Sequence, residues 1–191
     1  MPLSSFLRTA TLAGAALLAT VPSWAQQKLV PAQSSVAFTA RQLGVPLQGH
    51  FSQFDAQVAF DPAQLASSKI AFTVHTGSAT LGSRETDAEL PKAEWFNTAR
   101  FPQATFQSSS IKALGGGKFE VAGKLTIKGQ ARDVVVPVTL AQTGATTLAS
   151  GTLVLKRLAY QIGDGEWADT SLVADDVQVQ FKLALTGVPK L

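Results

Sequence analysis

The feature that most constrains the fold is a pair of alternating apolar stretches in the second half of the chain. Apolar residues take every second position there: Leu125, Ile127, Val134, Val136, Val138 and Leu140. The first stretch places Lys124, Thr126 and Lys128 between them. A period of two is typical of a strand with one buried face, so an antiparallel hairpin is predicted, with strands at 119–127 and 134–140. Gly129 and residues 130–133 form its predicted polar connection, and Pro137, which lacks an N–H, is predicted at an edge, bulge or strand end.

Residues 1–25 have the pattern of a secretory signal peptide. Arg8 supplies a positive charge, residues 10–19 form an apolar run, and Ser23-Trp24-Ala25 resembles a cleavage site with small residues. The pattern predicts export to the periplasm with cleavage after Ala25, and the alternative is an uncleaved anchor. Residues 26–191 are then the mature domain. The apolar run is too short for a transmembrane helix.

Composition narrows the class of protein further. A mature chain of 166 residues (191 − 25) is typical of one domain with a real core. The chain contains no cysteine, so burial and sheet hydrogen bonds must hold the fold. Removal of Arg8 lowers the net charge from +3 to +2, and no cluster of Lys or Arg occurs, which argues against a nucleic-acid partner.

Further alternating segments predict six more strands, at 35–40, 47–60, 70–74, 105–111, 148–162 and 176–186. Phe51 is out of phase with the rest of its strand, which predicts a bulge near Ser52-Gln53. Asp61-Pro62 predicts a short helical turn at 63–67. Eight strands with one helical insertion indicate an all-β barrel or sandwich.

The helical insertion spans residues 77–101. Ser83 is the predicted N-cap of its helix, and Leu90-Pro91 is the predicted end. The insertion is either a plug that fills one end of the β core or a lid over a ligand mouth, and the two are compatible.

The apolar phase of the strands is the strongest functional signal. A membrane barrel needs aromatic girdles, but this chain has one tyrosine and its polar phase suits a water-facing exterior. The inward phase is predicted to line either a solid core or a cavity. The candidate lining residues are Val36, Phe38, Phe72, Val74, Phe106, Phe119, Leu125, Ile127, Val134, Val136, Leu153, Leu155, Val177, Val179 and Phe181.

Several stretches, in order, resemble the YceI-like family of secreted lipid-binding proteins. They are Ser34–Phe38, Gly49–Phe54, Phe101-Pro102 with Phe106, Gly123–Gly129 with Pro137-Val138, and Lys156-Arg157 with Val177–Val179. The resemblance implies an extended, lipocalin-like antiparallel eight-stranded barrel. It also implies a long-chain lipid ligand, such as a polyprenyl phosphate, an isoprenoid quinone or a fatty-acid derivative, and it favours a tunnel over a solid core.

A lipid head group needs partners at the mouth of such a tunnel. Arg157 is in phase with Leu153 and Leu155, so we expect it to point inward and meet either an anionic head group or an acid of the 164–169 loop. Arg84 on the insertion and Trp167 beside the opening are the other candidate mouth residues.

Catalysis and metal binding have little support in the sequence. His50 and His75 lack further ligands at plausible spacing, and no Gly-x-Ser-x-Gly elbow is present. Residues 164–169 form an acidic loop, for which a solvated role is favoured over a cation site. We therefore expect a periplasmic, non-enzymatic lipid carrier without cofactor or metal. The alternative is an accessory protein that docks on a membrane cytochrome or redox enzyme to deliver or shield quinone. Transient membrane contact and a homodimer are compatible with either.

Overall fold

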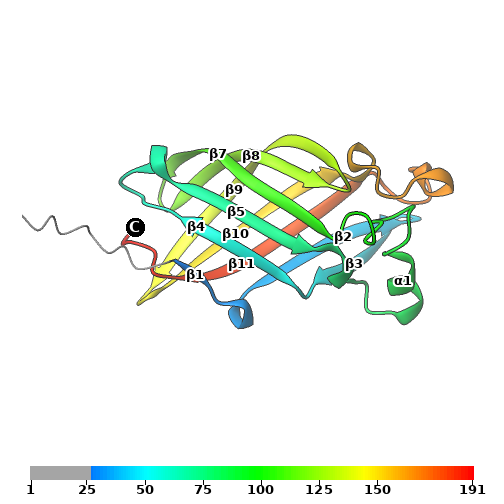
Figure 1. The fold of residues 1–191 in the computed structure, drawn as a ribbon, viewed down its shortest axis with the longest axis horizontal. Helices are drawn as coiled ribbons and strands as arrows, with labels where there is room; N and C mark the ends of the chain where they lie inside the picture. The colour runs from blue at the N-terminus through cyan, green and yellow to red at the C-terminus, as the bar shows by residue number, and fades with distance from the viewer. Residues whose placement is uncertain (1–26) are drawn as a thin grey trace, which may run out of the picture.

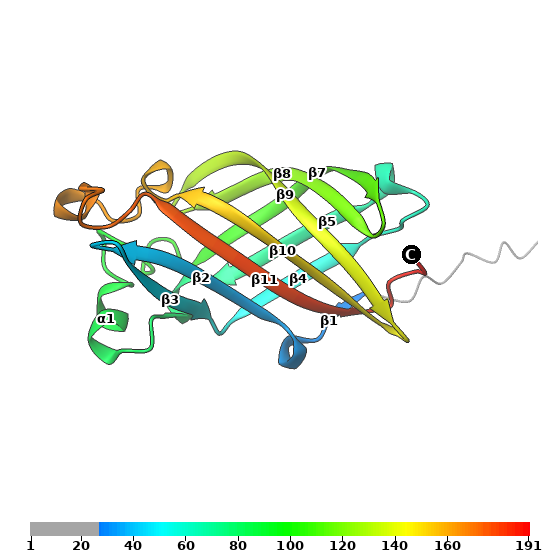
Figure 2. The same ribbon diagram turned by 180° about the vertical axis from the view of Figure 1, so that it is seen from behind.

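The strands of the computed structural model, which describes residues 27–191, form one antiparallel sheet that closes into an elongated barrel, seen from two sides in Figure 1 and Figure 2. The predicted signal peptide lies outside the described residues. The strands are β1 Lys28–Leu29, β2 Ser35–Gln42, β3 Val45–Phe51, β4 Phe54–Ala59, β5 Lys69–His75, β6 Ala79–Thr80, β7 Gln103–Gly115, β8 Lys118–Ile127, β9 Gln130–Thr143, β10 Thr146–Lys156 and β11 Asp176–Thr186.

The barrel has eight wall positions because two of its strands are interrupted. β1 and β2 both pair with β11, and β3 and β4 continue one another opposite β2 and β1. The wall then runs from β4 through β5, β7, β8, β9 and β10 to β11, and β1 closes it. This architecture confirms the predicted eight-stranded antiparallel barrel.

Helical structure in the described residues is short. The helix α1 spans Arg84–Glu89, and 3-10 turns cover Pro31–Gln33, Leu65–Ser67, Thr76–Ser78, Arg157–Tyr160 and Gly165–Ala168. Within residues 27–191, no helix has the length and apolar character needed to cross a membrane.

The two ends of the barrel differ in what covers them. We call the end that carries α1, residues 91–101 and the loop 157–175 the lid end (Figure 1). The opposite end carries the tight turns β7–β8 and β9–β10 and the C-terminus, and we call it the hairpin end (Figure 2).

The predicted single strand 47–60 is two strands, and a break replaces the predicted bulge. Ser52 N donates to Ser78 O at 3.2 Å, and Gln53 N donates to the Ser78 hydroxyl at 3.1 Å. These bonds take both residues out of the ladder. Phe51 remains inward and packs on Phe38 with ring centroids 5.3 Å apart.

The central hairpin turns more tightly than predicted. Lys128 and Gly129 form a two-residue turn with φ of 48° and 77°, the left-handed conformation that primed hairpin turns require. Residues 130–133 therefore belong to β9, and the prediction of a polar connection there was wrong. The turn also directs the Lys128 side chain away from the exposed face, where the strand pattern placed it, and leaves it only 6% exposed.

Pro137 lies where its missing N–H costs nothing. The ladder between β9 and β10 ends at Thr139 and Ser150, so Pro137 lies just beyond the paired region, opposite Glu120 of β8. Pro137 is therefore in the interior of β9 and not at a strand end, and the side of β9 without a paired partner there is the local edge that the prediction allowed. The strand predicted to reach residue 162 ends at Lys156, because the chain turns into the 3-10 segment that begins at Arg157.

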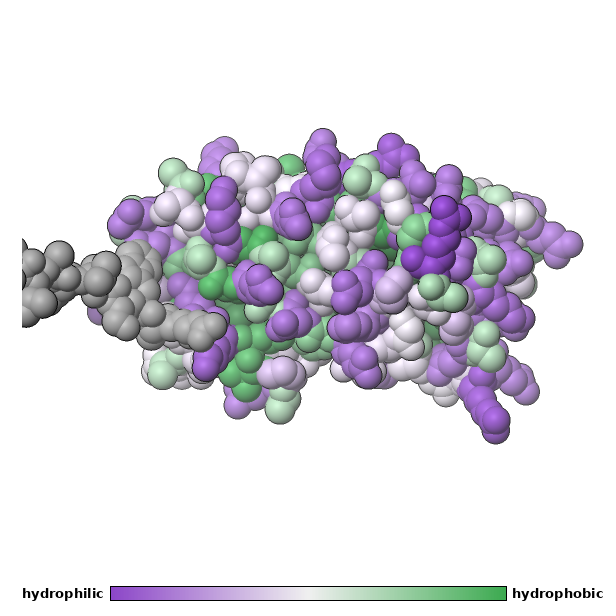
Figure 3. Space-filling model, viewed as in Figure 1, coloured by the Kyte–Doolittle hydropathy of each residue, from purple (hydrophilic) through white to green (hydrophobic). Residues whose placement is uncertain are grey.

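A cluster of buried apolar residues lies at the hairpin end. Phe60 and Phe119 meet edge to face with centroids 5.4 Å apart, inside a buried cluster. The cluster contains Phe60, Ile111, Phe119, Val121, Ala149, Leu185 and Val188. On the outside, hydrophilic side chains cover most of the face in Figure 3, and the hydrophobic ones gather in the half that carries the hairpin end.

Candidate functional site

The barrel encloses a cavity of about 390 Å³, within the usual range of small-molecule sites, which is roughly 300–1,000 Å³. Its wall is almost entirely apolar and runs from the packed cluster at the hairpin end to the lid end. Fourteen of the predicted lining residues belong to this wall: Val36, Phe38, Phe72, Val74, Phe106, Phe119, Leu125, Ile127, Val136, Leu153, Leu155, Val177, Val179 and Phe181. Their contact with a ligand stays a prediction.

Val134 has the predicted phase but lies outside the cavity wall formed by the described residues. It pairs with Gly123 across the β8–β9 ladder. The ring of Phe106 covers Gly123, with Cζ 2.6 Å from the position of an added Cβ. The aromatic ring therefore fills the interior at this register in place of Val134.

Glycines in the wall give phenylalanine rings room to lie against the sheet. Gly49 is directly opposite Phe38, and Gly151 is directly opposite Phe181. A Cβ at either glycine would come closer than 3.0 Å to the facing ring. The absence of a side chain at these two positions lets the rings lie flat, which keeps the centre of the barrel open.

The insertion forms part of the cavity wall at the lid end, as a plug or lid requires. Thr86 and Glu89 of α1, with Leu90 and Phe96 after it, line the cavity. Asp87 holds α1 to the preceding segment, since its carboxylate accepts hydrogen bonds from the Thr80 hydroxyl and from Leu81 N. These two bonds hold the pKa of Asp87 below its ordinary value.

Arg157 points inward, as its phase predicted, but it binds backbone rather than an acid. Its side chain is buried, at 3% exposure, and each of its five N–H groups has an acceptor. The acceptors are the carbonyl oxygens of Ile162, Gly163, Trp167, Val173 and Ala174, at 2.6–3.0 Å. Burial lowers the pKa of the guanidinium, and the charges of Asp175 and Asp164 oppose that shift. Arg157 therefore organises the loop 157–175.

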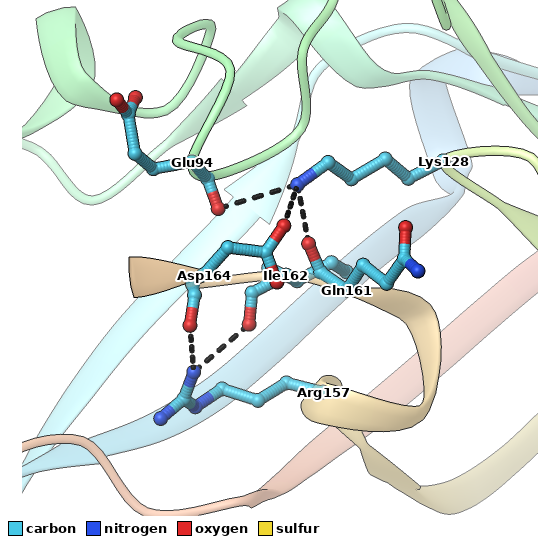
Figure 4. Close-up of polar contacts among 7 residues, drawn as sticks. Glu94, Lys128, Arg157, Gln161, Ile162 and Asp164 are labelled. Atoms are coloured by element: carbon cyan, nitrogen blue, oxygen red, sulfur yellow. Dashed lines mark hydrogen bonds and ion pairs between the residues drawn. The ribbon is translucent and has the colours of Figure 1, made fainter. Parts of the chain in front are cut away.

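Lys128 ties the insertion to this loop (Figure 4). Its Nζ donates to Asp164 Oδ2 at 2.9 Å, to Glu94 O at 3.4 Å, and to Gln161 O. Glu94 O also accepts from Gly163 N and Asp164 N at 2.7 and 3.0 Å. The acid of the loop thus pairs with Lys128, a residue that the strand pattern had placed on the exposed face.

Of the other two mouth candidates, Trp167 lines the cavity and Arg84 does not. Arg84 is exposed at the first position of α1 and lies outside the cavity wall of the described residues. Trp167 lines the cavity and packs on Trp95, with centroids 5.5 Å apart. Trp95 also lines the cavity but was missing from the predicted site, because its place depends on how the insertion folds.

The histidines lie elsewhere. His50 and His75 border a separate open pocket at the break between β3 and β4. Within residues 27–191, no group of three or more His, Cys, Asp or Glu residues is placed to hold a metal ion.

The family model of the YceI-like domain matches residues 27–185. The chain belongs to the YceI-like family. A UPF0312 protein from Vibrio cholerae is 29% identical over 157 residues, which cover 77% of this YceI-like chain and 83% of that protein. Protein YceI from Salmonella arizonae is 39% identical over 106 residues, 55% of this chain and 53% of its own length.

Solved structures share the barrel. The crystal structure of BcnA from Burkholderia cenocepacia is 46% identical and has a TM-score of 0.79, covering 82% of this chain and 98% of BcnA. A polyisoprenoid binding domain from Saccharophagus degradans has a TM-score of 0.69 at 15% identity, covering 84% and 98%. At that identity the likeness shows the fold alone.

Proposed function

We propose that this YceI-like protein is a carrier that holds an isoprenoid or another long-chain amphiphile in the barrel cavity and catalyses no reaction of its own. The observation that carries the proposal is the cavity itself, whose wall is almost entirely apolar and whose two charged lining residues, Glu89 and Arg157, both lie at the lid end. The Saccharophagus domain with the same fold is described as polyisoprenoid-binding, which supports this choice of ligand.

Affinity in such a site comes from burial of the chain. Each buried CH₂ group contributes about 0.8 kcal/mol, so about ten of them contribute roughly 8 kcal/mol before the cost of ordering is subtracted. No polar network is needed for binding. The proposed limit on chain length is the packed cluster at the hairpin end, where Phe60 and Phe119 meet.

The proposed place of action is the periplasm. The support for it is the signal-peptide pattern of residues 1–25, which carries Arg8, an apolar run and the Ser23–Ala25 cleavage site. Amino-terminal sequencing of protein recovered from the periplasm is expected to begin at Gln26. Recovery of uncleaved protein from a membrane fraction would favour the anchor instead.

The lid end is the proposed place of contact with a membrane. Leu43, Val45 and Leu172 are 69%, 60% and 39% exposed there, and Leu43 N donates to Leu172 O at 2.8 Å. Exposed leucines grouped beside the cavity suit insertion between lipids better than contact with water. Vesicle flotation of Leu43→Ser is expected to recover less protein with lipid than wild type. Leu114→Ser is the control, because Leu114 is 51% exposed at the hairpin end.

Native mass spectrometry of protein purified from the cells that make it tests the carrier directly. An isoprenoid or acyl species in stoichiometric amount is expected, and organic extraction names it. Val179→Trp fills the cavity and is expected to lose the ligand, while Gln178→Trp, its exposed neighbour on β11, keeps it. Bare wild-type protein that takes up neither quinone nor polyprenyl phosphate would show that the apolar interior is only a core.

A further inference from the structure

The strands β9 and β10 are paired with each other only in the half nearer the hairpin end (Figure 2). Their ladder holds five residue pairs and ends at Thr139 and Ser150. The ladders on their other sides, β8–β9 and β10–β11, continue to the lid end. In the described chain, residues 130–138 of β9 and 151–156 of β10 are therefore two strand edges that face each other without a ladder. We call this part of the wall the seam.

The charged side chains of the seam pair away from it. Continuing the register of the ladder would place Asp133 opposite Lys156. Asp133 instead binds Lys124 of β8 at 2.8 Å. Lys156 binds Asp176 of β11 at 2.6 Å. Pro137 adds to the separation, because it has no N–H to donate to a neighbouring strand. Two opposite charges that could join the edges are thus used on their outer sides.

The seam separates the outer surface from the cavity by one layer of apolar side chains. Val135 and Val154, which the same register would place opposite each other, are 54% and 55% exposed. Val136 on the β9 edge and Leu153 and Leu155 on the β10 edge line the cavity. Both faces of the wall are therefore apolar here, so an alkyl chain can cross it without losing apolar contact.

One exposed arginine bridges the seam at its lid-end limit. Arg132 of β9 donates from Nε and Nη2 to Ala159 O, at 3.3 and 3.2 Å. Ala159 lies in the 3-10 turn that follows β10, beside Tyr160, which is buried and lines the cavity. Among the described residues, these two are the side-chain hydrogen bonds that join 130–138 to 151–160. Because the donor is exposed, water can replace them at little cost.

We infer that the seam is a lateral entry for the lipid chain, and that Arg132 is the bridge that keeps it closed. The lipid then enters at the side of the lid end. Entry between the insertion and the loop 157–175 would instead break the bonds from Gly163 N and Asp164 N to Glu94 O. A chain that enters sideways leaves those bonds intact. The inference rests on the proposed carrier function and specifies how the ligand reaches the cavity.

Cross-linking the seam tests this route, because the chain contains no native cysteine. Val135→Cys and Val154→Cys are combined and joined by a bifunctional thiol reagent. The probe is a long-chain alcohol brominated next to its hydroxyl group, and stopped-flow mixing follows its quenching of Trp95 and Trp167, which line the cavity. Linked protein is expected to bind and release the probe at least about tenfold more slowly than unlinked protein. The dissociation constant is expected to stay within about twofold, because a gate alters rates and not the equilibrium.

A second pair of cysteines controls for the reagent. Gln107→Cys with Lys124→Cys is the matched control, because both residues are exposed and lie directly opposite each other in the β7–β8 ladder. Linking this pair is expected to leave both rates unchanged. Equal rates in the linked and unlinked seam variant overturn the lateral route while leaving the carrier function intact. Wild-type protein that does not bind the probe removes both proposals.

Arg132→Gln gives a further measurement that needs no cross-link. Loss of the bridge is expected to raise both rates by about threefold to tenfold, the net value of about one hydrogen bond, without changing the dissociation constant. Arg41→Gln is the matched control, because Arg41 is also exposed and donates to a backbone carbonyl, Gly44 O at 3.3 Å, within the β2–β3 hairpin. Equal rates in Arg132→Gln and Arg41→Gln overturn the assignment of Arg132.

Discussion

The hairpin end and the lid end of the barrel are built by different interactions. At the hairpin end, Phe60 and Phe119 pack edge to face within a buried apolar cluster. At the lid end, Arg157 and Lys128 hold loops together through backbone carbonyls and Asp164. Apolar packing resists opening because it is lost all at once, whereas hydrogen bonds between loops can be exchanged for water. We therefore expect a lipid chain to enter the barrel through the lid end.

The largest expected effect is at the hairpin end. Phe119→Ala removes a buried ring from contact with Phe60 and is expected to lower the free energy of unfolding by about 3–5 kcal/mol. Chemical denaturation measures it, with the exposed Leu114→Ala as control, for which a change within about 0.5 kcal/mol is expected. A small loss in Phe119→Ala would mean that this end is not the packed one.

Arg157→Met tests the lid end. It leaves five carbonyl oxygens of the loop 157–175 without their donor, and we expect a loss of about 2–4 kcal/mol. Hydrogen exchange is expected to rise in residues 162–174 and to stay low at the hairpin end. Arg84→Met is the control, because Arg84 is exposed, and its stability is expected to change by no more than about 0.5 kcal/mol. Uniformly faster exchange through the barrel would contradict the claim that the two ends are held by separate sets of interactions.

Gly151→Ala tests the wall between the two ends. The added methyl group meets Pro137 O and the Phe181 ring, so a loss of about 1–3 kcal/mol and weaker lipid uptake are expected. Gly77→Ala is the control, because no described atom outside its own neighbours lies within 4 Å of the added Cβ. Unchanged stability and lipid uptake in Gly151→Ala would show that the Phe181 ring can move aside for the added methyl group at no cost.

The smallest expected effect comes from pH. The pKa of Asp87 is lowered from an ordinary 3.8 by its bonds to Thr80 and Leu81, so the folded state favours the carboxylate. Its contribution is complete above pH 3.8 and is lost as the pH falls through the lowered pKa. Exchange of the Leu81 N–H relative to that of the hairpin end is expected to rise over this acid range, but not in Asp87→Asn. An equal rise in both proteins would assign the effect elsewhere.

The strands were predictable because alternation carries most of the information about a barrel wall. β11 occupies the predicted range of residues 176–186, and fourteen of the fifteen predicted lining residues face the cavity. Alternation does not predict the contacts that a residue makes beyond the end of its strand. Arg157 continues the phase of β10 yet begins a 3-10 turn, so its inward direction was predicted and its partners were not.

The lid end was less predictable because its contacts join segments far apart in the sequence. Lys128 is buried only because it adopts φ of 48° in a two-residue turn. A lysine side chain does not predict this backbone conformation. The Lys-Gly pair directly before a strand was the available signal, and it was assigned to a longer connection. Trp95 reaches the cavity because Glu94 O binds the loop of Gly163, a contact that no local pattern contains.

Tryptophan fluorescence most directly tests the claim that a lipid lies in the cavity with its head group at the lid end. The tryptophans of residues 27–191, Trp95 and Trp167, both line that end. A long-chain alcohol brominated next to its hydroxyl group is expected to quench their emission strongly, and the same alcohol brominated at its far end only weakly. Stronger quenching by the far-end bromine would contradict the account, because the chain would then enter in the opposite direction.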